Sequence, residues 1–337
     1  MSAAERLQRA WREGGALAQA LRPLGWLYGR IAGLRARLYR HGLLRVESLP
    51  VPVIVVGNWI VGGAGKTPTT LALLRLLQAH GLKAGVISRG YGRRGDGLRL
   101  VTRASTAAEV GDEPLLIHLR SAAPVAVGRD RVAAARALLA AHPDTQLLIS
   151  DDGLQHWRLP RALSVLVFDE RGLGNGRLLP AGPLRQDRPL SAEPSLVLYN
   201  ASRPSTPLPG HLAQRRLAGA VELAAWWRGE PARPETLAAL RGRPVLAAAG
   251  MAQPERFFGM LRAEGLTVEG LALPDHHDFA ALPWHAGTPE VLLTEKDAVK
   301  LDPARLAGTR AWVVALDFRP EESFEQALLA QLPALLP

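Results

Sequence analysis

The sequence predicts an α/β protein: a mostly parallel sheet flanked by helices, followed by a second, smaller α/β domain. Three observations predict this fold class. Short apolar runs alternate with helical patterns from Val51 onward, a glycine-rich loop separates the first run from the first helix, and the alternation resumes after residue 205. Strands that alternate with helices form βαβ units, in which the strands are parallel and the helices cover the sheet.

The spacing of apolar residues predicts the individual elements. Short apolar runs predict strands at 51–56, 84–88, 147–150, 163–168 and 196–199, and in the second domain at 245–249, 268–273, 291–294 and 312–316. Apolar residues three and four apart predict helices at 71–79, 129–141, 254–264 and from about residue 321. The proline-rich segment 202–210 is expected to be a linker. The long Gly/Pro-rich loop 172–189 is expected to be functional.

Composition limits the possible functions. The chain of 337 residues has no cysteine, which excludes disulfides, thiolate zinc sites and cysteine nucleophiles. Apolar residues make up 47% and charged residues 21%, as is typical of a folded globular protein. The net charge of +10 indicates an anionic partner, which could be nucleic acid, a membrane surface or a phosphorylated substrate.

Most of the excess charge lies in residues 1–45, where nine arginines and two glutamates leave a net charge of +7. This concentration argues against an extended nucleic-acid surface and for a local basic anchor. Apolar residues three and four apart predict an amphipathic helix here, and Pro23 is expected to begin a second helical segment. Arg22, Pro23 and Arg30 interrupt the apolar run, so no span of about 20 apolar residues exists to cross a membrane.

Two interpretations of this segment remain open. The helix could lie in a membrane interface, with its arginines at anionic headgroups. It could instead pack its apolar face on its own domain and expose an arginine-rich face to solvent.

The strongest chemical signal is G-N-W-I-V-G-G-A-G-K-T at 57–67, between a predicted strand and a predicted helix. This is the context of a phosphate loop, so a P-loop NTPase-type sheet that binds a nucleotide and Mg²⁺ is predicted. Lys66 would contact the β- and γ-phosphates, and the Thr67 hydroxyl would hold Mg²⁺. Position 60 has isoleucine where the strict motif has glycine. The predicted nucleotide-binding residues are Ile60, Val61, Gly62, Gly63, Ala64, Gly65, Lys66 and Thr67.

Two other segments only partly match known motifs. G-Y-G-R-R-G at 90–95 satisfies G-x-G-x-x-G, but an extended segment is expected after it where a dinucleotide site needs a helix. T-E-K-D at 294–297 lacks the spacing of a guanine-specificity motif, which disfavours a GTPase.

Acidic residues and histidines supply the remaining candidates. The predicted strand at 147–150 ends in Asp151 and Asp152, which could serve Mg²⁺ and phosphate or form a solvated turn. Asp112 precedes a predicted helix and could be a general base or simply an N-cap. In the polar run 275–278, which includes His276, a histidine could pair with an acid from the other domain or the run could be a plain polar loop, whereas a metal site there is disfavoured.

Eight segments together resemble the tetraacyldisaccharide 4′-kinase family of lipid A biosynthesis, in family order and over nearly the whole chain. They are V-G-N-W-I-V-G-G-A-G-K-T-P (56–68), S-R-G-Y-G-R (88–93), G-D-E-P (111–114), D-D-G-L-Q-H (151–156), G-N-G-R-L-L-P-A-G-P-L-R (174–185), A-G-M-A-Q-P-E-R-F-F (249–258), P-D-H-H-D-F (274–279) and T-E-K-D-A-V-K-L (294–301). The family's loop also lacks the first glycine. The family usually has glutamate where this chain has Gln186.

The resemblance implies an ATP-dependent kinase that phosphorylates the 4′-hydroxyl of a tetraacyldisaccharide 1-phosphate to give lipid IVA. It implies a peripheral protein at the cytoplasmic face of the inner membrane of a Gram-negative bacterium. Asp112 would be the acid/base group, His276 its partner, and Asp151 and Asp152 would serve Mg²⁺ and phosphates. The candidates for binding the substrate's phosphate are Arg89, Arg129, Arg131 and Arg185.

Three segments are expected on this interpretation: a basic membrane-interface segment at 1–45, a P-loop kinase domain at 46–205, and a smaller α/β domain at 206–337 that closes over the active site. The partners would be an anionic glycolipid and a membrane surface, without nucleic acid. Two alternatives are a nucleic-acid-stimulated ATPase, which needs basic residues along a groove, and a membrane-docked P-loop switch, which needs a base-specificity motif. Neither feature is found in the sequence.

Overall fold

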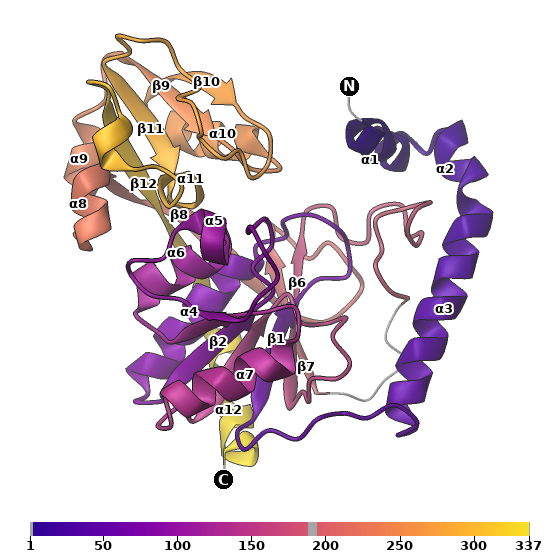
Figure 1. Ribbon diagram of the computed structural model, residues 1–337. Helices are drawn as coiled ribbons and strands as arrows, with labels where there is room; N and C mark the ends of the chain where they lie inside the picture. The colour runs from indigo at the N-terminus through magenta and orange to yellow at the C-terminus, as the bar shows by residue number, and fades with distance from the viewer. Residues whose placement is uncertain (1–2, 188–193, 337) are drawn as a thin grey trace. The chain divides into compact units, whose positions relative to one another are not determined.

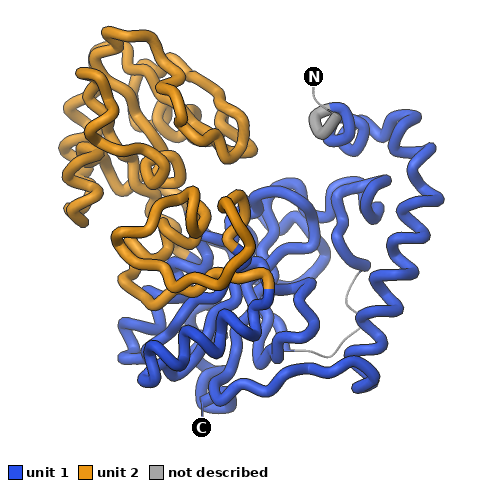
Figure 2. The backbone as a smooth tube through the Cα atoms, viewed as in Figure 1, with its two compact units in different colours: residues 1–89, 130–214, 320–337 blue, residues 90–129, 215–319 orange. Residues whose placement is uncertain are grey.

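Contacts divide the chain into two units, which Figure 2 shows in different colours. Unit 1 comprises residues 1–89, 130–214 and 320–337, and unit 2 comprises residues 90–129 and 215–319. The computed structural model describes residues 3–187 and 194–336, so the ends of the predicted segments 1–45, 172–189 and 206–337 lie partly outside the described residues. This division groups residues 90–129 with the second half of the chain, whereas the sequence-based boundaries kept them in the kinase domain.

Unit 1 is built on parallel strands in the order β7-β6-β1-β5-β2. The strands are β1 (Val53–Gly57), β2 (Ala84–Ser88), β5 (Leu147–Asp151), β6 (Leu163–Asp169) and β7 (Ser195–Asn200). Four of them, β1, β2, β5 and β6, are buried along their whole length, as expected for a parallel sheet covered on both faces. The helices α4 (Lys66–Ala79), α7 (Arg131–Ala141) and α12 (Glu322–Leu335) pack on these strands (Figure 1).

The strand register places the carboxyl ends of β1, β5 and β6 side by side. Val56 of β1 lies beside Asp151 of β5 on one side and Val165 of β6 on the other. Because parallel strands share one carboxyl edge, the loops after β1, β5 and β6 emerge side by side, which is where open α/β sheets bind ligands.

Three helices begin unit 1: α1 (Ala3–Glu13), α2 (Ala16–Ala20) and α3 (Arg22–Arg40). Pro23 lies in the first turn of α3, which confirms the prediction that a new helical segment begins there. Among the helices that the structure describes, none has the length and apolar character needed to cross a membrane.

Unit 2 contains a second parallel sheet with the strand order β10-β9-β11-β12. Its strands are β9 (Pro244–Ala249), β10 (Thr267–Ala272), β11 (Glu290–Thr294) and β12 (Arg310–Pro320). Helix α10 (Pro254–Ala263) packs on β9 and β10 through Phe258 and Leu261, which are fully buried in the core of this unit. The α/β fold class predicted for both halves of the chain is thus confirmed.

Unit 2 also holds shorter elements. They are β3 (Arg99–Leu100), α5 (Ala107–Val110), α6 (Asp112–Ser121), β4 (Val125–Val127), α8 (Leu223–Arg228), α9 (Pro234–Ala238), α11 (Glu295–Ala298) and a 3₁₀ turn at Pro303–Arg305. Strands β3 and β4 form an antiparallel pair, and β8 (His211–Glu222) begins in unit 1 and continues into unit 2. The four-residue helix α11 packs on α6, and this contact brings distant parts of the sequence together.

Candidate active site

The glycine-rich loop after β1 has the backbone of an anion-binding loop. Gly62 and Gly65 have φ values of +92° and +99°, a left-handed conformation that glycine adopts without steric cost. The loop leads directly into α4, whose first residue is Lys66. The N-terminus of a helix carries partial positive charge, so this end of α4 favours a phosphate group.

Side chains from three strand ends hold the carbonyl groups of this loop. Four consecutive carbonyl oxygens accept hydrogen bonds from side chains, namely those of Val61, Gly62, Gly63 and Ala64. Arg171 donates to the first and third at 3.3 and 3.0 Å, Asn58 to the second at 3.3 Å, and Asn200 to the fourth at 2.9 Å. Arg171 Nε in turn donates hydrogen bonds to both carboxylate oxygens of the buried Asp169. Carbonyl oxygens that would repel a phosphate are thereby bound by the protein.

Lys66 belongs to a network of polar side chains beside the loop. Its Nζ donates to Asn58 Oδ1 at 3.2 Å and lies 3.9 Å from Asp152 Oδ1. Arg185 binds both oxygens of Asp152, at 2.7 and 3.1 Å, and also donates to the Asn58 carbonyl at 3.1 Å. Burial alone would raise the pKa of Asp152, but Lys66 and Arg185 lower that pKa below its ordinary value. The carboxylate is therefore ionised and neutralises two cations next to the loop.

Asp152 also has an unusual backbone conformation, with φ at +52°. A non-glycine residue in the left-handed region is uncommon, and such residues concentrate at functional sites, where surrounding contacts hold them. Here the contacts come from Arg185 to the side chain and from Arg131 Nη2 to the backbone oxygen at 2.9 Å.

Asp151 and Thr67 are the predicted magnesium ligands. Asp151 ends β5 with 1% of its surface exposed, and its Oδ1 accepts a hydrogen bond from Thr70 at 3.3 Å. The oxygen donors in this region fit Mg²⁺, which is usually held by one or two carboxylates together with substrate phosphates and water. Among the residues that the structure describes, no three His, Cys, Asp or Glu side chains form a cluster that could hold a metal by themselves.

The four candidate phosphate-binding arginines differ in position. Arg131 and Arg185 meet at Asp152, and each has a buried Nε atom without a hydrogen-bond partner among the described residues. Arg89, at the end of unit 1's first segment, is exposed. Arg129 belongs to unit 2, where it pairs with the exposed Asp96 at 3.0 Å. The structure therefore assembles two of the four beside the phosphate loop.

The buried Asp112 and the partly exposed His276 form a hydrogen-bonded pair within unit 2. Asp112 Oδ2 lies 2.8 Å from His276 Nδ1, and Asp112 Oδ1 accepts a hydrogen bond from the Glu113 backbone at 2.9 Å. Gly111 occupies the N-cap of α6, and Asp112 is the first residue of the helix. The N-cap alternative for Asp112 is thus not what the structure shows. His276 has a φ of +60°, so it is a second polar residue held in the left-handed region.

The charges around this pair keep Asp112 ionised. Burial alone would raise the pKa of Asp112, but the hydrogen bond from His276 and the positive charge of Lys296 lower it below its ordinary value. The hydrogen bond to Asp112 raises the pKa of His276, while burial and Lys296 oppose that rise. A carboxylate paired with an imidazole in this way can accept a proton from a bound hydroxyl group.

Comparisons with known proteins show the family of the chain. The profile of LpxK, tetraacyldisaccharide-1-P 4′-kinase, matches residues 17–333. The chain is 58% identical to the tetraacyldisaccharide 4′-kinase of Methylibium petroleiphilum, over 98% of this chain and 94% of that protein. The corresponding protein of Leptothrix cholodnii is also 58% identical, over 99% and 97%. The chain belongs to the tetraacyldisaccharide 4′-kinase family.

A solved structure of the same family has this fold. LpxK from Aquifex aeolicus, crystallised as an "apo" form in complex with ATP, matches with a TM-score of 0.80 and 28% identity, over 95% of this chain and 100% of that one. The predicted P-loop fold, the kinase class, the ATP requirement and the place in lipid A biosynthesis are confirmed by these relationships.

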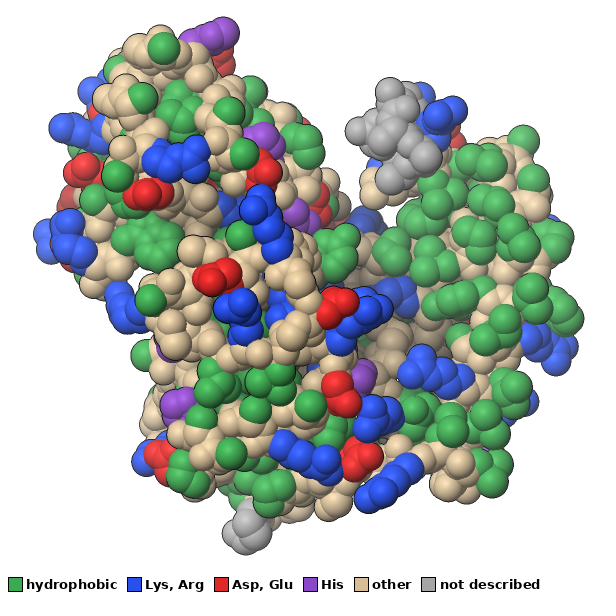
Figure 3. All heavy atoms as spheres, in the orientation of Figure 1, with side chains coloured by type: hydrophobic (Ala, Val, Ile, Leu, Met, Phe, Trp, Pro, Cys, Tyr) green, Lys and Arg blue, Asp and Glu red, His purple; other side chains and the backbone are tan. Residues whose placement is uncertain are grey.

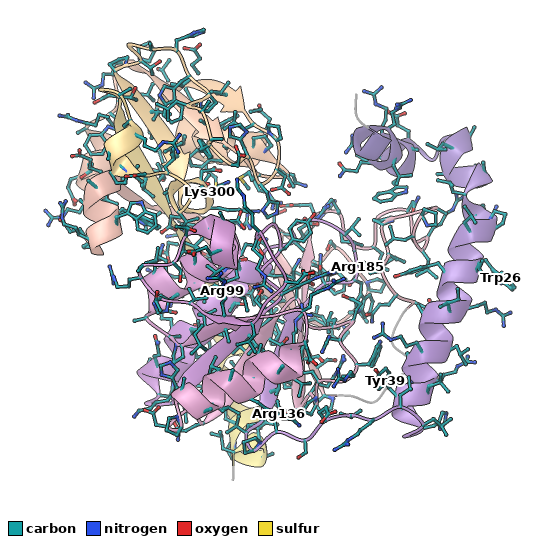
Figure 4. The ribbon with its side chains drawn as sticks, in the orientation of Figure 1. Trp26, Tyr39, Arg99, Arg136, Arg185 and Lys300 are labelled. Atoms are coloured by element: carbon teal, nitrogen blue, oxygen red, sulfur yellow. The ribbon has the colours of Figure 1, made fainter. Side chains whose placement is uncertain are left out.

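The kinase connects its N-terminal helix to the phosphate loop. Tyr28 of α3 donates a hydrogen bond from its hydroxyl to the Arg185 carbonyl at 2.6 Å, and burial raises the pKa of that hydroxyl. The segment before Arg185 reaches the phosphate loop, because Val61 N donates to the Pro183 carbonyl and Arg185 N to the Trp59 carbonyl. Figure 4 shows Arg185, which belongs to the loop after β6, between α3 and the strands of unit 1. The described part of the predicted functional loop, residues 172–187, is thus hydrogen-bonded both to α3 and to the phosphate loop.

Several residues of the site were not found by reasoning from the sequence. Arg171 and Asn200 were not singled out, although both lie at or just after the ends of predicted strands, where polar residues are a general signal of a site in parallel sheets. Lys296 was noted only within a motif. Gln186, where the family usually has glutamate, accepts a hydrogen bond from Gln155 at 2.9 Å.

Proposed function

We propose that this kinase transfers the γ-phosphate of ATP to the 4′-hydroxyl of a tetraacyldisaccharide 1-phosphate, forming lipid IVA, and that the two units divide the chemistry. Unit 1 would bind ATP, and unit 2 would supply the base. The observation that carries this proposal is the Asp112–His276 hydrogen bond of 2.8 Å, in a chain that also has a glycine-rich phosphate loop leading into α4.

In unit 1 the proposed work is binding and charge neutralisation. The backbone N–H groups of residues 60–67 would surround the phosphates, while Arg171, Asn58 and Asn200 keep the loop carbonyls turned toward the protein. Lys66 would bind the β- and γ-phosphates, and Arg185 would stabilise the charge that develops on the transferred group. Thr67 and Asp151 would hold Mg²⁺, which when bound neutralises charge on the phosphate oxygens.

In unit 2 the proposed work is proton transfer and orientation. A carboxylate oxygen of Asp112 would take the proton of the acceptor hydroxyl as that hydroxyl attacks. His276 would orient the carboxylate through its Nδ1–H. Phosphoryl transfer depends mainly on positioning and electrostatics, so one base of modest strength suffices.

The proposed reaction is tested by incubating the wild-type protein with ATP labelled at the γ-phosphate and tetraacyldisaccharide 1-phosphate. Label should appear in the lipid at the 4′ position. An acceptor in which the 4′-hydroxyl is replaced by hydrogen serves as the control and should remain unlabelled. Release of label as inorganic phosphate alone would reject the kinase assignment in favour of an ATPase.

The N-terminal segment is proposed to bind the cytoplasmic surface of the inner membrane. On α3, Gly25, Tyr28 and Gly29 face the loop around Leu178 and Ala181, where a larger residue at Gly29 would meet Leu178 at 2.5 Å. The opposite face exposes large apolar side chains, among them Leu27, Ile31 and Leu34 at 49%, 62% and 58%. Trp26 also projects away from the rest of unit 1 (Figure 4).

This arrangement supports a membrane interface over the second interpretation, in which the apolar face would be buried on the domain. Figure 3 shows apolar side chains gathered over α2 and α3, with basic side chains along their margin. Apolar side chains bordered by arginines match the chemistry of an interface that contains anionic lipid.

A double substitution Leu27→Glu/Ile31→Glu is expected to lower binding to vesicles that contain anionic lipid by at least about 100-fold. Burial of each side chain is worth about 1.5–3 kcal/mol, and each 1.4 kcal/mol is a factor of ten. Vesicle co-sedimentation measures the change. The matched control Leu98→Glu/Leu100→Glu alters exposed leucines of unit 2 and should leave binding unchanged. Equal binding by wild type and the α3 variant would exclude this face as the anchor.

A further inference from the structure

Lys296 lies where the Asp112–His276 pair meets the short helix α11. Its Nζ lies 3.2 Å from Asp275 Oδ1, 3.3 Å from His276 Nε2 and 3.4 Å from Glu113 Oε1. An ammonium group has three N–H donors and no lone pair, and here it has three acceptors within hydrogen-bond or ion-pair distance. Its side chain is 21% exposed. The proposed function gives no task to this residue.

The residues around Lys296 hold α11 in place. Thr294 caps the helix and donates to Asp297 Oδ2 at 2.6 Å, and the same carboxylate accepts from the Gly250 backbone at 3.1 Å. Glu295 is 6% exposed and accepts hydrogen bonds from Arg120 and from the Leu316 backbone. Residues on both sides of Lys296 are therefore fixed by buried contacts, so its side chain has a defined direction.

We propose that Lys296 is a positioning residue of the phosphoryl-transfer reaction, which sets the tautomer and the charge of His276. A donor facing Nε2 requires a lone pair on that nitrogen, so the ring proton lies on Nδ1 and is donated to Asp112. A second ring proton would place an imidazolium 3.3 Å from an ammonium, which like-charge repulsion disfavours. Lys296 thus opposes protonation of His276 and favours the ionised form of Asp112. This assignment rests on the proposed role of Asp112.

The other groups near His276 do not replace this effect. Asp275 Oδ1 lies 3.9 Å from Nε2, and the Tyr91 ring lies 5.2 Å from the imidazole between centroids. Glu113 faces Lys296, and Lys300 contributes positive charge near Asp112 while it binds Asp297. The neighbouring carboxylates raise the pKa of Lys296 although burial alone would lower it. Lys296 is therefore charged across the physiological range.

Removal of the positive charge of Lys296 should shift the pKa values of Asp112 and His276 in one direction. The protonated forms of Asp112 and His276 become more favourable without it, so both pKa values rise. The neutral-imidazole, ionised-carboxylate form then predominates only at higher pH. In Lys296→Met the acidic limb of the kcat profile is expected to move up by about one pH unit. Lys296→Arg keeps the charge and should leave the limb near its wild-type position.

The decisive measurement does not depend on turnover. Long-range ¹⁵N–¹H NMR spectra of the histidine rings report tautomer and pKa, with His276→Gln assigning the signal. Wild-type His276 should show the Nδ1–H tautomer, and its pKa should rise by about one unit in Lys296→Met but not in the control Lys83→Met, which alters an exposed lysine of unit 1.

Several outcomes would overturn the proposal: an Nε2–H tautomer in the wild type, an unchanged His276 pKa in Lys296→Met, or a rate that falls by one factor at every pH. The last result would indicate a structural role only. The NMR experiment needs no substrate, so it tests the role of Lys296 even if the protein does not phosphorylate the glycolipid. Failure of this proposal and failure of the proposed function are therefore distinguishable.

Discussion

Replacement of Lys66 with alanine is expected to lower kcat/KM for ATP by about a thousandfold, which corresponds to about 4 kcal/mol of transition-state stabilisation. The ammonium group is the cation of the phosphate loop, and its fixed partners are Asn58 at 3.2 Å and Asp152 at 3.9 Å. Without it, charge that develops on the transferred group loses a preorganised donor. Steady-state kinetics with labelled ATP measures the effect.

The matched control is Lys83→Ala, which removes an exposed lysine of the same unit that pairs with Asp144. This control should change kcat/KM by less than about twofold, since exposed ion pairs contribute little. Asp152 keeps Arg185 in the Lys66 variant, so the fold should persist and thermal unfolding should be close to that of the wild type. A Lys66→Ala protein with near-normal kcat/KM would contradict the assigned role.

Asp112→Asn is expected to lower kcat by about 10³-fold with a smaller change in KM for ATP. The substitution keeps the size of the side chain and its acceptor for His276 but removes the basic carboxylate, and general base catalysis is typically worth 10²–10⁴-fold. ATP would bind in unit 1, whereas Asp112 lies in unit 2, so ATP binding should survive. Single-turnover phosphorylation of the glycolipid separates the chemical step from binding.

Asp144→Asn is the appropriate control for this change, because Asp144 is an exposed aspartate whose ion pair is formed with the surface residue Lys83. It should retain wild-type kcat. If Asp112→Asn retains more than about a tenth of the wild-type rate, deprotonation of the acceptor by this residue is not rate-determining, and the base must be sought elsewhere.

The phosphate loop could be predicted because its residues are contiguous. Gly62, Gly65, Lys66 and Thr67 follow one another between a buried strand and a helix, so local sequence alone carries the signal. The same holds for the strands: the predicted runs at 84–88, 147–150 and 163–168 match β2, β5 and β6 to within one residue. Their continuous apolar composition reflects burial on both faces.

Contacts across the sheet could not be predicted in this way. Arg171 reaches the phosphate loop only because β6 lies beside β1, and Asn200 does so from the next strand, β7. Strand order depends on the whole fold and leaves no local pattern in the sequence. The pairing of Asp112 with His276 also joins residues 164 positions apart, and the resemblance to a family was needed to name His276 as the partner of Asp112.

Strand β8 and the grouping of residues 90–129 were missed for a related reason. Strand β8 alternates buried, partly buried and exposed residues without a clear apolar run, and it directly follows the proline-rich segment. Residues 90–129 follow β2 in the chain, yet their helix α6 (Asp112–Ser121) packs on α11 (Glu295–Ala298), which lies far along the chain. The amino-acid composition does not change at the ends of such a discontinuous unit, so its limits could not be predicted from the sequence.

The hydrogen bond from Tyr28 to the Arg185 carbonyl has a geometric consequence. It couples the position of Arg185 to that of α3, whose opposite face carries the exposed apolar side chains. If that face sinks to the boundary between headgroups and acyl chains, the depth of the helix determines which layer of a glycolipid is level with the phosphate loop. The enzyme would then select one sugar hydroxyl by its distance from the bilayer surface as well as by contacts to the sugar.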